Sequence, residues 1–306
     1  MNTQELALVI YTILVQMSVG AFVILGLVHL YAERKSDQKN ADEMSDRALL
    51  AIGPVVVLGV VASFFHLGNP LNAFRAINNL GTSWLSREIL FTVLFVVVGA
   101  VFAIFQWRKI GSYRLRQLIA LLAAVLGVAV VYSMASIYQL TSQPAWNSLA
   151  TPITFFTTAF LLGALALGVA FVVNYYILQR KKDAANIEIQ SEMLRTVLQW
   201  IAIGSIVMLG LQLVVVPLFI SQLSAGSAAA VESAGKLTGD FGWIFAIQLI
   251  LVALGAGVFG LFLYRNALLN NQRMMTNYVI VAFALVLIGE LLGRYLFYAI
   301  HVRIGI

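Results

Sequence analysis

The sequence predicts an all-α integral membrane protein with eight transmembrane helices. The chain has 306 residues, of which 61% are hydrophobic and only 10% are charged. Its mean hydropathy is +0.93. Soluble domains carry about 25% charged residues. We therefore expect residues 1–306 to form a single polytopic membrane domain.

Eight apolar runs are long enough to cross a bilayer, which takes about 20 predominantly apolar residues. The first run follows Glu5 rather than a basic segment, and it ends at Arg34 and Lys35 without a small-residue cleavage site. We interpret it as a retained helix and not as a signal peptide. The predicted helices cover about residues 6–30, 48–66, 88–107, 115–140, 150–179, 197–223, 241–264 and 276–300.

The basic residues divide unequally between the two faces of such a bundle. Connections 31–47, 108–117, 180–196 and 265–275 lie on one face and hold four, four, four and two of the 19 Lys and Arg residues. Basic loops are retained in the cytoplasm. This face is therefore predicted to be cytoplasmic, and both termini to be periplasmic. The even number of helices also suggests a duplication of two four-helix bundles.

Composition excludes several kinds of site and partner. There is no cysteine, so disulfides, cysteine-ligated iron–sulfur clusters and a CxxC redox pair cannot form in this protein. The net charge of +6 is explained by basic loops at a membrane, and no nucleic-acid partner is expected. Only His66 and His301 share a face, so at most one bis-His haem can form. We expect no haem and no metal, with His301 exposed at the interface.

The segment 64–90, FFHLGNPLNAFRAINNLGTSWLSREIL, joins the second and third helices on the periplasmic side. His66 ends one helix and Glu88 begins the next, so both are predicted at the same depth. Such groups can simply mark the water interface, and Arg87 is interpreted in this way. For His66 and Glu88 we favour a functional site, because ionisable groups inside membranes are costly and a histidine changes charge near neutral pH.

Two other places on the same side carry polar residues. Glu290 and Arg294 are spaced i, i+4 in the eighth helix and are expected to neutralise each other as an ion pair. A structural tie and a role in a proton path both remain open for them. Tyr138 belongs to a polar stretch after the fourth helix, which is interpreted either as a pocket lining or as an interfacial belt.

The segment 224–240, SAGSAAAVESAGKLTGD, is small and polar. Its composition predicts a flexible, solvated external loop.

Two motifs carry a family resemblance. HLGNPLNAFRAINNLGTSWLSREI at 66–89 and PAWNSLATPITFF at 144–156 resemble the membrane anchor subunits of bacterial dimethyl sulfoxide reductases. The resemblance implies a haem-free subunit of the bacterial inner membrane, without terminal reductase activity of its own. It implies that this subunit oxidises menaquinol and passes electrons to an iron–sulfur subunit, which feeds a molybdopterin catalytic subunit on the periplasmic side.

The resemblance also suggests roles for individual residues. His66 and Glu88 match the quinol-site residues of the family and are our candidates for catalysis: His66 accepts a quinol proton and Glu88 relays protons outward. Arg75 is expected to orient the loop or the Glu88 carboxylate. The other candidates for quinol binding or support are Gly68, Pro70, Ser86, Tyr138, Glu290 and Arg294. The alternative is an eight-helix secondary transporter whose charged site faces outward.

Overall fold

The computed structural model describes residues 3–65, 75, 78–180 and 184–305. Eight helical segments in this part are long and apolar enough to cross a membrane, which confirms the predicted fold class. Five of the spans are α1 (Thr3–Lys35), α2 (Gln38–Phe64), α3 (Trp84–Arg108), α4 (Tyr113–Ile137) and α5 (Ala150–Gln179). The other three are α6 (Ala184–Ser224), the combined α8 (Gly242–Val252), η3 (Ala253–Phe259) and α9 (Gly260–Leu268), and α10 (Gln272–Ala299).

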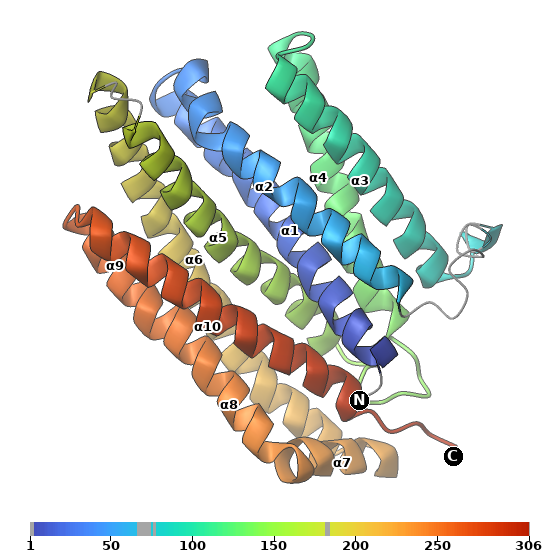
Figure 1. Ribbon diagram of the computed structural model, residues 1–306. Coiled ribbons are helices and arrows are strands. Elements are labelled where there is room, and N and C mark those ends of the chain that lie inside the picture. Colours follow the sequence, from blue (N-terminus) through green and yellow to red (C-terminus); the bar gives the residue numbers. More distant parts are fainter. Residues whose placement is uncertain (1–2, 66–74, 76–77, 181–183, 306) are drawn as a thin grey trace.

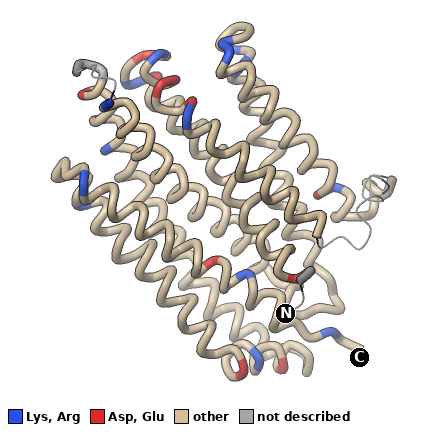
Figure 2. The backbone as a smooth tube through the Cα atoms, in the orientation of Figure 1, with Lys and Arg blue, Asp and Glu red and all other residues tan. Residues whose placement is uncertain are grey.

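The helices run up and down, so that both termini lie at the same end of the bundle, called the termini end below (Figure 1). Charged residues gather at this end and at the opposite, far end, with few along the middle (Figure 2). This distribution is expected of a bundle whose middle faces lipid, because charges there are costly. The periplasmic position of the termini remains a prediction.

Several helices continue beyond their apolar runs. α2 begins at Gln38 rather than near residue 48, and α6 begins at Ala184 rather than near 197. At the start of α2, the Asp37 side chain accepts a hydrogen bond from the backbone N–H of Asn40 at 2.8 Å and caps the helix. Hydropathy alone misses such extensions, because their residues are polar although they are helical.

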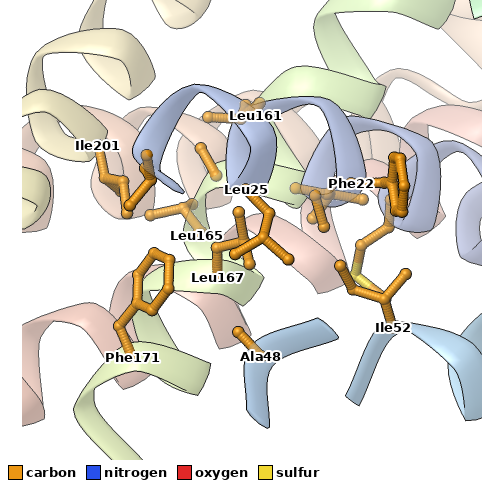
Figure 3. Packing of buried hydrophobic residues seen from close by; sticks show 14 of the residues in the cluster. Phe22, Leu25, Ala48, Ile52, Leu161, Leu165, Leu167, Phe171 and Ile201 are labelled. Atoms are coloured by element: carbon orange, nitrogen blue, oxygen red, sulfur yellow. The ribbon is translucent and has the colours of Figure 1, made fainter. Parts of the chain in front are cut away.

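α1 lies in the centre of the fold, in contact with α2, α4, α5 and α10. The buried apolar side chains shown in Figure 3 come mainly from α1, α2 and α5. α1 and α5 approach most closely at two glycines. A Cβ atom built on Gly20 would lie 1.9 Å from the carbonyl oxygen of Ala159, and one built on Gly163 would lie 2.3 Å from the backbone nitrogen of Ala21. Such close backbone contact is typical of membrane helices with small residues at the interface.

At the far end, a polar network joins α2, α3 and α4. Lys109 forms ion pairs of 2.7 Å with Asp42 and 2.9 Å with Asp46. The Gln106 amide nitrogen donates to the same two carboxylates, at 2.6 and 2.9 Å, and its oxygen accepts from Arg116 Nε at 3.0 Å. Gln106 therefore links buried groups of opposite charge through both ends of one amide.

Replacing Gln106 with leucine should lower the free energy of unfolding by about 1–3 kcal/mol, because Asp42 and the buried Arg116 each lose a hydrogen-bond partner. Denaturant unfolding in detergent would measure the change. Arg108→Leu serves as the control, since Arg108 is exposed and its replacement should change stability by less than about 0.5 kcal/mol. Equal stability of the Gln106→Leu variant and the parent would contradict this role.

Residues 228–240 of the segment 224–240 are helical, so the prediction of a flexible loop is wrong. They form α7 (Ala228–Gly235) and the π-helix η2 (Lys236–Asp240). Ser227 caps α7 by accepting a hydrogen bond from the N–H of Ala230. Alanine has the highest helix propensity, and one face of the segment is buried against the end of α6. The buried residues on that face are Ala230, Ser233, Ala234 and Leu237.

Candidate functional site

Glu88 lies in the second turn of α3, inside the bundle at the termini end. Its side chain is only 6% exposed. The Tyr11 hydroxyl of α1 donates a hydrogen bond to Glu88 Oε1 at 2.9 Å and lies 3.4 Å from the Thr92 hydroxyl oxygen. None of the ion pairs between described residues includes Glu88. A buried carboxylate without a cationic partner is expensive in a membrane, which favours a functional role.

The start of α3 is held in place by its own turn. Ser83 caps the helix, with its hydroxyl 3.3 Å from the Ser86 backbone nitrogen. Arg87 donates to the carbonyl oxygens of Leu80 and Gly81, both at 2.8 Å. These contacts fix the position at which Glu88 enters the bundle. Arg87 thus anchors the turn, and Ser86 is buried beside it.

Four candidates from segment 64–90 remain: His66, Gly68, Pro70 and Arg75. His66, Gly68 and Pro70 lie outside the described residues. Arg75 is exposed. The hydrogen-bond partner found for Glu88 is Tyr11. The roles of these four candidates therefore stay predictions.

Tyr138, at the end of α4, belongs to an aromatic cluster. Its hydroxyl lies 2.9 Å from that of Tyr298, and its ring packs edge-on against Trp146 and Phe297. Trp146 Nε1 donates to the Phe297 carbonyl at 2.7 Å. Tyr138 therefore joins the end of α4 to α10 at the termini end of the bundle.

His301 also belongs to this cluster. It is partly buried and stacks on Trp146, with 4.4 Å between ring centroids. Its Nδ1 is 2.6 Å from the Tyr298 carbonyl oxygen. The expectation of an exposed interfacial histidine is thus wrong, because the segment after α10 lies against the connection between α4 and α5, where the Ile304 nitrogen donates to the Ser142 carbonyl oxygen at 2.9 Å.

Glu290 and Arg294 do not form the expected ion pair. The Thr158 hydroxyl donates to Glu290 Oε2 at 2.6 Å, and the Gln212 amide donates to Oε1 at 2.7 Å. No ion pair between the two is found in the described part of the protein. Spacing i, i+4 permits such a pair, but α5 and α6 supply closer neutral donors for the carboxylate.

The Arg294 guanidinium contacts groups on other helices instead. One terminal nitrogen donates to Gln16 Oε1 at 2.9 Å. The guanidinium carbon lies 3.7 Å from the ring centroid of Phe155, a favourable cation–π distance. Arg294 thus ties α10 to α1 and α5 in the middle of the fold.

The site is therefore organised by α1, which sequence reasoning missed. Tyr11 of α1 holds Glu88, and Gln16, also on α1, holds Arg294. Both are buried polar residues in an apolar helix. That pattern is the signal that would have identified them, because polar side chains in transmembrane helices tend to face the bundle interior.

Metal ligation finds no support in the described residues, where no group of three or more His, Cys, Asp or Glu side chains is placed to hold an ion.

A family model described as the DMSO reductase anchor subunit, DmsC, matches residues 1–300. The chain belongs to this family. The predicted resemblance to the dimethyl sulfoxide reductase anchor subunits is thereby confirmed. The match runs over residues 1–300, so the family assignment covers all eight membrane-length helices.

Three curated relatives are similar to this DmsC-family protein. One is a chain of the anaerobic dimethyl sulfoxide reductase of Escherichia coli, 29% identical over 98% of this sequence and 96% of its own. A second, from the anaerobic dimethyl sulfoxide reductase of Haemophilus influenzae, is 26% identical over 100% of this sequence and 98% of its own. The third belongs to the sulfite dehydrogenase of Allochromatium vinosum and is 30% identical over 52% of this sequence and 51% of its own.

Family membership and the eight membrane-length helices confirm the prediction of a multi-pass protein of the bacterial inner membrane. An anchor subunit implies catalytic and electron-transfer partners. Membership in an anchor-subunit family also argues against the alternative of a secondary transporter.

Proposed function

We propose that this protein oxidises menaquinol at the termini end and passes the electrons to an iron–sulfur subunit of a dimethyl sulfoxide reductase-type complex. The observation that carries the proposal is the buried Glu88, hydrogen-bonded to Tyr11. Glu88 lies in segment 64–90, which also contains His66. A quinol site requires proton acceptors within the membrane, and the buried Glu88 carboxylate beside Tyr11 is such a group in the membrane-length helix α3.

Oxidation of a quinol releases two protons and two electrons. A neutral histidine is a suitable first base, because its ordinary pKa of about 6.5 lies close to working pH. In our proposal His66 accepts one proton from a quinol hydroxyl. Glu88 accepts a proton and releases it toward the water at the termini end.

Tyr11 positions the Glu88 carboxylate. Its hydroxyl donates to Glu88 and lies within 3.4 Å of Thr92. It can thus keep a hydrogen-bond partner when the carboxylate becomes protonated. This arrangement lets the site change its protonation without leaving a buried hydroxyl unpaired.

Electrons leave this subunit directly for a partner, because it has no cysteine to hold a cluster of its own. The iron–sulfur subunit and the molybdopterin subunit behind it are proposed to dock on the periplasmic side, at the termini end. Two of the named relatives belong to dimethyl sulfoxide reductases, which supports an S-oxide as the terminal substrate.

Substituting His66 with leucine tests the proposal. Loss of the base should reduce quinol-supported turnover of the purified complex by about 10²- to 10⁴-fold. Activity with an artificial donor that reduces the iron–sulfur subunit directly should be unchanged. Stopped-flow reduction of the partner's clusters by a menaquinol analogue would measure the step itself. Wild-type cluster reduction in the variant would exclude His66 as the base, whereas loss of complex assembly would assign it a structural role.

A further inference from the structure

A cavity of about 130 Å³ lies between α5, α6, α8 and α10, apart from Glu88. Towards the termini end its lining includes Ala145, Leu237 and Ile300, which lie just outside the ends of the transmembrane helices. Deeper in the bundle its lining includes Glu290, and Thr151, Thr154 and Thr158 line it from one face of α5. The cavity therefore extends from the end of the bundle to a buried carboxylate.

Glu290 is the acid of this cavity, and its neighbours leave it without a paired charge. α5 and α6 contribute Thr158 and Gln212, the two donors to its oxygens. α8 contributes Gln248, another neutral amide in the lining. Arg294, on α10, is the charged residue that shares the cavity. A carboxylate in this position is costly to ionise unless water reaches it.

Arg294 provides a second, independent observation. It is 5% exposed, and its Nε atom has no hydrogen-bond partner among the described residues. An unsatisfied donor on a buried charged group costs more than the roughly 1–3 kcal/mol typical of neutral groups. Buried water is the usual partner of such atoms, and each water makes about three hydrogen bonds. Arg294 thus adds a buried cationic side chain with an unsatisfied donor to the residues that line the cavity.

The size of the cavity decides which ligand it takes. Pockets for drug-sized ligands measure about 300–1,000 Å³, and a single benzene ring already takes a cavity of about 150 Å³. At about 30 Å³ for each water in the liquid, a cavity of this size holds roughly four waters. A quinol head group is therefore too large, while a short file of waters fits.

We propose that this cavity is a water-filled proton path from the termini end to Glu290, which exchanges protons with the aqueous phase there. Glu290 is then a second proton-exchanging carboxylate, separate from the Glu88–Tyr11 pair. This inference rests on the proposed function in one respect only: quinol oxidation is taken as the source of the protons. Water access and proton exchange at Glu290 are properties of this protein whether or not quinol binds to it.

Thiol accessibility tests the water path, because the native sequence has no cysteine that would react in the background. Val216 lines the cavity from α6, whereas Val214 on the same helix is 58% exposed on the outer surface of the bundle. In the complex in vesicles, Val216→Cys and Thr154→Cys are treated with Ag⁺, an ion close to water in size, from the termini end. Unreacted thiols are then labelled with a fluorescent maleimide after denaturation.

We expect Ag⁺ to modify the two cavity cysteines roughly tenfold faster than Val214→Cys, because thiols ionise and react in water but not in lipid. Cavity cysteines that react as slowly as Val214→Cys would overturn the water path. Ser142→Cys, in the connection at the termini end, confirms that the reagent is active.

Infrared difference spectra recorded across a pH change test the second half of the proposal. A carbonyl band of a protonated carboxyl should disappear in Glu290→Gln and persist in Glu88→Gln. A band that is unchanged in Glu290→Gln would overturn proton exchange at Glu290. Neither measurement uses quinol turnover, so failure of this inference can be distinguished from failure of the proposed function.

Discussion

A Glu88→Gln variant is expected to lose quinol-supported turnover by about 10²- to 10⁴-fold, the range that removal of a proton-transfer group typically costs. Glutamine preserves the size of the side chain and can still accept the hydrogen bond from Tyr11. The variant should therefore fold and assemble normally. Glutamine cannot accept a proton, so the loss of turnover would be due to the missing proton transfer and not to altered packing.

Two companion variants separate proton transfer from positioning. Tyr11→Phe removes the donor to the carboxylate and should cause a smaller loss than Glu88→Gln, because the acid itself remains. Val93→Ala serves as the matched control, because Val93 is on α3 and is 52% exposed on the outer surface. Turnover of this variant should equal that of the parent. Steady-state rates with a menaquinol analogue and with an artificial donor would be compared in each. Near-normal turnover of Glu88→Gln across a range of pH would rule out Glu88 as the relay.

A Gly163→Ala variant is expected to lose more than about 3 kcal/mol of stability, at or beyond the upper end of what overpacking usually costs. The added Cβ would lie 2.3 Å from the Ala21 nitrogen and 2.5 Å from the Gly20 carbonyl carbon. These are backbone atoms, which cannot rotate aside as a side chain does. α1 and α5 would have to separate, and α1 carries Tyr11 and Gln16 of the site.

The matched control is Gly99→Ala on α3, where an added Cβ would meet nothing within 4 Å. This change should be neutral or should stabilise the helix by about 0.5–1 kcal/mol. Unfolding by denaturant in detergent, monitored together with retention of the complex, would measure both variants. Equal stability of the two would contradict the close packing of α1 on α5.

Much of the fold could be predicted from the sequence because membrane insertion depends on local properties. A run of about 20 apolar residues has few alternatives to a spanning helix, since each backbone polar group must be satisfied within its own segment. The eight spans and the family followed from such local patterns and from the motif at 66–89. The helical segment 228–240 was missed because its helicity depends on burial against α6, which composition does not show.

The sequence by itself determined the membrane architecture, the absence of cysteine chemistry and Glu88 as a candidate acid. Only the tertiary structure decided that Tyr11 holds Glu88, that Gln16 and Phe155 receive Arg294, and that Thr158 and Gln212 bind Glu290. The partners in each of these contacts are far apart in the sequence. Which of them meet depends on how the helices pack, and a close contact such as Gly20 against Ala159 sets that packing more than hydrophobicity does, because lipid is as apolar as the helix surfaces.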